Sequence, residues 1–200
     1  MVIADAEERH LPEILEIYNE VIATTTAVYS EEPVTLESRV EWWKIRTALH
    51  YPVLVALDDG VVLGFASFGD FRPWPCYRHT IEHSVHVRAD ARNRGVGRAL
   101  IKTLFPRAVA LGKHIMIGGV DADNAASIHL HRKLGFEPVA HLREVGRKFD
   151  RWLDLVFLQR ALSDADRDAQ KTIRDTGDPE VRTSHGVRNG LSLSGRRRLH

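Results

Sequence analysis

Residues 80–112 most constrain the fold, because a strand pattern there passes through an arginine- and glycine-rich turn into a helix pattern. The turn, residues 92–98, contains Gly95 and Gly97, whose lack of side chains lets backbone N–H groups approach a ligand closely. The helix expected over residues 96–111 adds a partial positive charge at its N-terminus. The segment predicts either a site for pyrophosphate or a similar dianion, or simply a tight strand-to-helix turn.

The strand predicted before this turn has one mainly apolar face and one polar face. Side chains alternate between the two faces along a strand. One face carries Ile81, His83, Val85 and Val87, and the other carries Thr80, Glu82, Ser84 and His86. The polar set is typical either of a solvent-facing surface or of the floor of a polar cleft, and periodicity does not choose between them.

The remaining patterns predict a mixed α/β fold. In chain order they indicate a helix at residues 11–22, a helix capped by Thr35, a hairpin of strands at residues 53–57 and 61–68, the strand and helix described above, a strand at residues 114–120, a helix from Asn124 to Leu134 and a strand at residues 152–158. The second helix is expected to bury Leu36, Val40 and Trp43. A hairpin followed by helical crossovers predicts a mixed sheet with helices on both faces.

Composition restricts the class of protein. Lys and Arg number 28 against 27 Asp and Glu, a net charge of +1, which argues against a strongly basic nucleic-acid binder. The single cysteine, Cys76, excludes an intramolecular disulfide framework and any multi-cysteine metal cluster. No apolar run approaches the roughly 18 residues of a membrane span. We therefore expect a soluble, cytoplasmic protein with no nucleic-acid or membrane partner.

The composition changes after Leu162. Residues 163–200 contain no aromatic residue, and their apolar residues are scattered singly. Such a segment buries too little apolar surface to offset its ordering entropy. We expect a working domain at residues 1–162 and a polar, disordered tail at residues 163–200. The arginines at residues 196–198 are read as part of this solvated tail, with contact to an acidic partner or nucleic acid as the alternative.

Several motifs in order resemble one enzyme family. The sequence Arg-x-x-Gly-x-Gly at residues 92–97, Asn124 and the pair Gly135-Phe136 are similar to the GNAT superfamily of acyl-CoA N-acyltransferases. The resemblance covers about residues 1–160. It extends to the phosphinothricin and methionine sulfoximine acetyltransferase branch through the motifs at residues 69–73, 77–85, 121–127 and 146–152. This resemblance implies the GNAT fold, with a mostly antiparallel, twisted mixed sheet.

The resemblance also implies a co-substrate site. Acetyl-CoA would be the acetyl donor, with its pantetheine arm against the strand and the next helix and its pyrophosphate on the turn. The residues implied are Val85, His86, Val87, Arg92, Asn93, Arg94, Gly95, Val96, Gly97, Arg98, Asn124 and Ser127. Transfer would be direct, with no covalent enzyme intermediate. Cys76 is expected to be a partly buried loop thiol, with an acyl-accepting nucleophile as the alternative.

Two residues are the implied catalytic groups. Glu82 corresponds to the family's general base and would take the proton of the attacking amine, either directly or through a water. Its alternative is an ordinary solvent-facing carboxylate. His131 stands where many members of the family carry the tyrosine that protonates the leaving thiolate, and its alternative is a helix-surface histidine. The oxyanion would be met by a backbone N–H near Val87.

The acceptor would be a small amino acid or an analogue. Arg72 and Arg78 are the candidates for binding its carboxylate, because a guanidinium binds a carboxylate through two parallel hydrogen bonds. Either could instead be a surface ion-pair partner. Trp74 and Tyr77 would wall the side-chain pocket or simply pack the loop, and Thr80 would lie beside Glu82.

No metal is expected, because neither close pair of histidines is arranged to chelate. His83 and His86 point to opposite faces of a strand, and His129 and His131 diverge on a helix. Two other functions stay open: acetyl transfer to a peptide or protein amine, and a non-catalytic acyl-CoA-binding regulatory module. The resemblance implies a homodimer.

Overall fold

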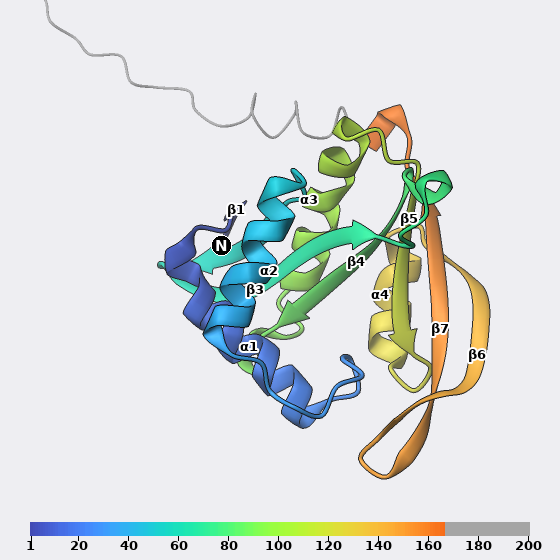
Figure 1. The fold of residues 1–200 in the computed structure, drawn as a ribbon, viewed down its shortest axis with the longest axis horizontal. Helices are drawn as coiled ribbons and strands as arrows, with labels where there is room; N and C mark the ends of the chain where they lie inside the picture. The colour runs from blue at the N-terminus through green and yellow to red at the C-terminus, as the bar shows by residue number, and fades with distance from the viewer. Residues whose placement is uncertain (167–200) are drawn as a thin grey trace, which may run out of the picture.

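The computed structural model describes residues 1–166, which form one seven-stranded mixed sheet covered by helices (Figure 1). The strand order is β1-β2-β3-β4-β5-β7-β6, and every neighbouring pair is antiparallel except β4 and β5. The strands are β1 (Val2–Asp5), β2 (Val53–Asp58), β3 (Val61–Asp70), β4 (Thr80–Val87), β5 (Ile115–Asp121), β6 (Glu137–Lys148) and β7 (Arg151–Ala161). The helices are α1 (Leu11–Thr24), α2 (Leu36–Ala48), α3 (Val96–Ala110) and α4 (Ala125–Lys133).

Helices cover both faces of the sheet, as the sequence predicts. Alternation along β2 shows the division: Val53 and Val55 pack with α1, whereas Leu54 and Ala56 pack with α3. The α1 side also receives partly buried side chains of α2, and the α3 side receives partly buried side chains of α4. The polar face of β4 therefore lies on the α1 and α2 side, since its opposite face carries the buried Ile81.

Two predicted local signals are confirmed. Asp59 and Gly60 have positive φ values of 48° and 83° and connect β2 to β3 as a two-residue hairpin turn. Thr35 caps α2, because its side-chain oxygen accepts a hydrogen bond from the backbone N–H of Ser38 at 3.3 Å.

The predicted burial of α2 is partly wrong. Val40 and Trp43 are half-buried, but Leu36 is 40% exposed. Leu36 is the first residue of the helix, and burial begins only one turn later. The buried residue of α2 is instead Arg39, an arginine on the face that covers the sheet.

The two edge strands β1 and β6 were not predicted. β1 is only four residues long, and β6 is exposed at every position from residue 137 to residue 145. A strand exposed on both faces shows no alternation of apolar and polar residues, so its sequence carries no strand signal. Pro138 is tolerated there because an edge strand has a free side.

The last turn of α1 and the residues that follow it are held against β6 and β7. The ammonium of Lys148, which is 1% exposed, donates hydrogen bonds to three backbone carbonyls. The acceptors are the carbonyl oxygens of Ile22, Thr25 and Val28, at 2.6, 2.8 and 2.8 Å. Tyr29 packs onto Gly146, where a Cβ would lie 2.4 Å from its ring. We call residues 22–29 the tethered segment.

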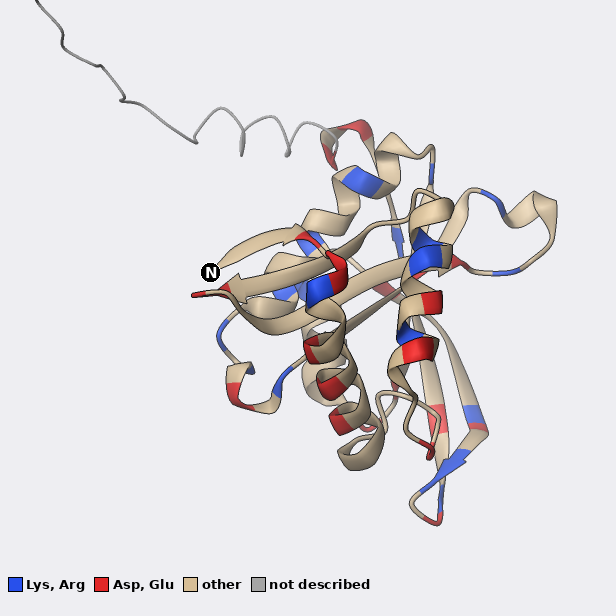
Figure 2. Cartoon of the chain, turned by 60° about the vertical axis from the view of Figure 1, so that its left-hand side comes forward, with Lys and Arg blue, Asp and Glu red and all other residues tan. Residues whose placement is uncertain are grey.

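The predicted domain boundary lies near the end of the described residues. After β7, Asp166 is 9% exposed and accepts hydrogen bonds from Arg160 at 2.5 Å and from Ser163. The rest of the predicted tail, residues 167–200, lies outside the described residues. Over residues 1–166 no helix is long and apolar enough to cross a bilayer. Positive and negative residues are interspersed along the ribbon (Figure 2).

Candidate functional site

The first cavity lies where β4 and β5 separate. These strands pair only from Thr80 to Glu82 on β4, whereas β4 pairs with β3 as far as Val87. The edge of β4 that faces β5 therefore has no strand partner beyond Glu82 within residues 1–166. An unpaired strand edge offers backbone N–H and C=O groups to an extended ligand.

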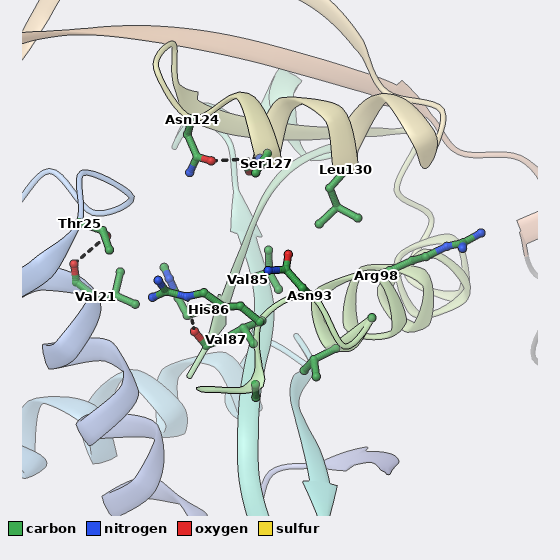
Figure 3. Close-up of a pocket in the computed structure, with 16 residues that line it drawn as sticks. Val21, Thr25, Val85, His86, Val87, Asn93, Arg98, Asn124, Ser127 and Leu130 are labelled. Atoms are coloured by element: carbon green, nitrogen blue, oxygen red, sulfur yellow. Dashed lines mark hydrogen bonds between the residues drawn. The ribbon is translucent and has the colours of Figure 1, made fainter. Parts of the chain in front are cut away.

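This loop cavity, of about 330 Å³, is enclosed by β4, the turn at residues 92–98 and the start of α4. Figure 3 shows Asn124, Ser127 and Leu130 on one side of it and Val85, His86 and Val87 on the other. Eleven of the twelve predicted cofactor-binding residues line it, namely Val85, His86, Val87, Arg92, Asn93, Gly95, Val96, Gly97, Arg98, Asn124 and Ser127.

The turn has the backbone that its glycines predict. Gly95 has φ +80°, a left-handed conformation that other residues adopt only with strain, and it precedes the first turn of α3. The N-terminal N–H groups of α3 therefore face the cavity with no side chain at Gly95 or Gly97 to cover them. Arg94 is the exception among the predicted residues, since its side chain pairs with Asp58 at 3.2 Å and does not line the cavity.

A second cavity of about 340 Å³, the central cavity, reaches from α1 and α2 across β4 to His131 on α4. It shares Val85, His86 and Ser127 with the loop cavity, so the two cavities meet at β4. Its polar lining includes Glu82, Ser84 and His131, while Trp42 and Phe65 supply apolar walls. The polar face of β4 is therefore the floor of a cleft and not a solvent-facing surface.

Glu82 is partly buried in this cavity. Burial raises the pKa of its carboxyl above the usual range, and the positive charge of Arg72 opposes that shift. The carboxylate lies over β5 at Gly119, where a Cβ would come within 2.9 Å of its Oε1 atom. A buried carboxyl whose pKa is raised towards neutrality is suited to accept a proton from an amine.

His131 is buried and contacts His83, which the sequence analysis placed on the mainly apolar face of β4. Their Nε2 atoms lie 3.1 Å apart, and the rings stack at 5.1 Å between centroids. Burial lowers the pKa of both groups, that of His83 to about 3, so both rings are neutral at pH 7. His131 is thus not an ordinary surface histidine.

The hydrogen bonds determine which nitrogen of each ring carries its proton. Nδ1 of His131 lies 2.7 Å from the carbonyl oxygen of Ser127, which only accepts, so Nδ1 carries the proton. Nε2 of His131 then accepts from Nε2 of His83, and Nδ1 of His83 is a buried acceptor without a partner. In this neutral form His131 has no proton at Nε2 to donate.

Two glycines on β5 make room for these groups on opposite faces of the sheet. A Cβ at Gly118 would lie 3.0 Å from the Nε2 atoms of both His83 and His131, and one at Gly119 would meet Glu82. Successive residues of a strand point to opposite faces. The Gly-Gly pair in the middle of an apolar strand was the sequence signal for this arrangement, because glycine weakens a strand and marks a close approach.

The structure adds two arginines that the sequence analysis missed. Arg39 and Arg46 lie two helical turns apart on α2, and both line the central cavity. Their seven-residue spacing on either side of Trp42 was the available signal. Arg46 crosses β3 at Gly69, where a Cβ would lie 2.0 Å from its Nη1 atom.

The predicted acceptor-binding residues lie on or next to the loop between β3 and β4. Arg72, Trp74, Tyr77 and Arg78 are exposed, Thr80 is half-buried, and none of them lines either cavity. The side chain of Arg78 donates to the carbonyl of Pro75 at 3.3 Å. Of this group, Arg72 is the one whose charge acts on Glu82.

The structure also places the remaining sequence candidates. Cys76 is an exposed free thiol on the same loop, so the expected partial burial of its side chain is wrong. Across the described chain, no three His, Cys, Asp or Glu side chains gather so as to hold a metal ion. Asn124 caps α4 by accepting the backbone N–H of Ser127 at 3.0 Å through Oδ1.

Comparisons with known proteins identify the family of the chain. Residues 14–136 match the family described as the acetyltransferase (GNAT) family. An L-methionine sulfoximine/L-methionine sulfone acetyltransferase of Pseudomonas aeruginosa is 50% identical over 158 residues, which cover 78% of this chain and 92% of that protein. A phosphinothricin N-acetyltransferase of Alcaligenes faecalis is 40% identical and covers 78% of this chain and 80% of that protein. A solved acetyltransferase from Salmonella typhimurium with its cofactor acetyl-CoA superposes with a TM-score of 0.80 at 44% identity, covering 82% of this chain and 94% of that one.

Proposed function

Because the chain belongs to the acetyltransferase (GNAT) family and is an acetyl-CoA-dependent N-acetyltransferase, we propose that its acceptor is the α-amine of a small amino acid or analogue. Methionine sulfoximine, methionine sulfone and phosphinothricin are the candidate acceptors, after the names of the relatives. The observation that carries the proposal is Glu82, a partly buried carboxylate in a cavity of about 340 Å³ that meets the loop cavity. That volume suits a small molecule.

The loop cavity is the proposed site of acetyl-CoA. The free edge of β4 at Val85, His86 and Val87 would pair with the pantetheine amides as an added strand would. Backbone N–H groups of residues 92–98 would bind the pyrophosphate at the start of α3, with Arg94 contributing its backbone only. Asn124 and Ser127 would contact the pantetheine from α4. Acetyl-CoA supplies a thioester whose acetyl group is transferred to the amine.

Glu82 would act as the general base. An unperturbed α-amino group has a pKa of about 8 and is mostly protonated at pH 7, so it must lose a proton before it attacks. A carboxylate with a raised pKa accepts that proton more readily than an exposed one. Thr80 and Ser84, on the same face of β4, would hydrogen-bond the amine or the carboxylate. The backbone N–H near Val87 would stabilise the developing oxyanion.

His131 would protonate the leaving sulfur from Nε2, after Nε2 has taken up the proton that the attacking nitrogen releases as the C–S bond breaks. In its neutral form its Nδ1 proton is committed to the carbonyl of Ser127, and its Nε2 accepts from His83. Donation from Nε2 therefore requires that His131 first take up a second proton, which burial disfavours.

The β3–β4 loop is proposed to contact the acceptor at the mouth of the central cavity. The loop residues concerned are Arg72, Trp74, Tyr77 and Arg78.

The proposal predicts a narrow range of acceptors. Free-thiol release from acetyl-CoA should occur with methionine sulfoximine, methionine sulfone and phosphinothricin. It should be at least about tenfold slower with spermidine or a lysine peptide, because Arg39 and Arg46 in the central cavity repel the additional positive charges of these amines. A faster reaction with the peptide would contradict an amino-acid acceptor. Acetyl-CoA binding with no turnover on any of these amines would contradict the proposed acceptor class.

We also propose that the enzyme works as a cytoplasmic homodimer. Exposed aromatic side chains support a second copy near the loop, since Trp74 is 62% exposed and packs on Tyr77 at 6.4 Å between ring centroids. The single cysteine is consistent with a reducing compartment. Light scattering at micromolar concentration should give twice the chain mass of 22.6 kDa, and a monomer mass would contradict the dimer.

A further inference from the structure

Arg39 is a buried cation with no partner of opposite charge. It is 6% exposed, and its guanidinium lies over the rings of Tyr18 and Trp42 at 4.1 and 4.6 Å from their centroids. Its Nε atom is buried without a hydrogen-bond partner. Among the ion pairs of residues 1–166 none includes Arg39. A buried charge is costly unless something pairs with it.

The charges around Arg39 do not neutralise it. Glu82 is the single carboxylate among the residues that line the central cavity, and burial holds its proton more tightly than usual. Arg46 adds a second positive charge to the same lining, although Asp70 lies near enough to Arg46 to act on it. His86 beside Arg39 is neutral, because burial first and the charge of Arg39 second lower its pKa to about 4. The cavity thus favours a ligand that carries negative charge or oxygen acceptors.

The position of Arg39 on the sheet indicates which part of a ligand it meets. Glu82 and His86 lie on the same face of β4 and are four residues, or about 13 Å, apart along the strand. Arg39 lies at the His86 end, since the ring of Tyr18 that it covers contacts His86 at 5.4 Å. An acceptor that passes its amine proton to Glu82, directly or through a water, and extends along the cavity in the direction of His86 brings the end of its side chain to Arg39.

We propose that Arg39 is the specificity-determining residue for the end of the acceptor's side chain, where it binds a tetrahedral, oxygen-bearing group such as a sulfone, sulfoximine or phosphinate. The inference rests on the proposed function and adds the subsite that distinguishes these acceptors from methionine, whose thioether is a weak acceptor. A planar guanidinium can donate two parallel hydrogen bonds to two oxygens of one such group. The rings of Tyr18 and Trp42, over which the guanidinium lies, hold it in place when no ligand is bound.

The test compares acceptors that differ only at that end. For Arg39→Met we expect kcat/KM to fall about 100-fold with phosphinothricin, about tenfold with methionine sulfone and less than threefold with methionine, because the lost interaction scales with the charge on the oxygens. Arg39→Lys keeps the charge and should recover part of the phosphinothricin rate. Lys44→Met, at an exposed position of the same helix, is the control and should leave all three values unchanged.

The outcomes separate this inference from the proposed function. An equal fall for all three acceptors in both Arg39 variants would show a packing role and overturn the inference, as would no fall. An acceptor-dependent fall in Arg72→Met but not in Arg39→Met would place the subsite on the β3–β4 loop. The dissociation constant of acetyl-CoA, measured by calorimetry, should be the same in every variant. Wild-type enzyme that binds acetyl-CoA but acetylates none of the three acceptors would instead overturn the proposed function.

Discussion

Replacing Glu82 with Gln is expected to lower kcat by about 10²–10³-fold, the contribution of a positioned general base. The amide keeps the size and the place of the side chain over Gly119 but cannot accept the proton of the amine. The affinity for acetyl-CoA should not change, because Glu82 does not line the loop cavity. Steady-state thiol release, together with calorimetric titration of acetyl-CoA, measures both quantities.

The pH dependence of the reaction rate tests the role of Glu82 independently. Burial raises the pKa of Glu82, so the wild-type rate should fall as pH decreases through that raised pKa, and this limb should be absent in Glu82→Gln. The folded state binds the proton of Glu82 more tightly than the unfolded state, so its carboxylate lowers stability at neutral pH. The variant should therefore unfold at the same temperature or higher. Glu41→Gln, exposed on α2, is the control, and an unchanged kcat in Glu82→Gln would remove Glu82 from the mechanism.

Replacing Lys148 with Met is expected to lower the free energy of unfolding by about 3 kcal/mol, because three backbone carbonyls lose one charged donor. The midpoint of thermal unfolding should fall by about 6–12 °C for a domain of this size. The tethered segment contributes Thr25 to the loop cavity and Ala27 and Val28 to the central cavity. The variant should therefore also show raised KM values for both substrates.

A surface lysine provides the comparison for this prediction. Lys102→Met, at an exposed position of α3, should leave the unfolding free energy within about 0.5 kcal/mol of wild type. Chemical denaturation followed by tryptophan fluorescence measures both variants. A Lys148→Met protein as stable as the Lys102 variant would mean that solvent satisfies the three carbonyls. The hydrogen bonds from Lys148 to the tethered segment would then not contribute to the free energy of unfolding.

Local patterns in the sequence predicted the elements whose two faces differ. The alternation along β4 assigned Glu82 and His83 to opposite faces, and the structure places them in the central cavity and against the buried ring of His131. The cap at Asn124 and the hairpin turn at Asp59 and Gly60 were equally local. Each of these features depends on residues within a few positions of one another.

Contacts between distant segments were not predictable in the same way. His83 and His131 are 48 positions apart, and the sequence offered only pairings with nearer histidines. Arg39 looks like a surface arginine until the helix is placed on the sheet, because burial of a charge follows from tertiary packing. The motif at residues 146–152 resembled a family feature without an assigned purpose. In the structure its Gly146 and Lys148 hold the tethered segment.

The adjacent glycines of β5 fix the register of this strand in the sheet. If β5 slipped by one residue along its neighbours, Gly119 would lie beneath the two imidazoles, where a glycine still fits. Val120 would then lie beneath the carboxylate of Glu82, where even a Cβ atom comes within 2.9 Å of Oε1. A slip in the other direction would bring Ile117 against the imidazoles at Gly118. Only one register of β5 therefore leaves room for Glu82 on one face of the sheet and for the histidine pair on the other.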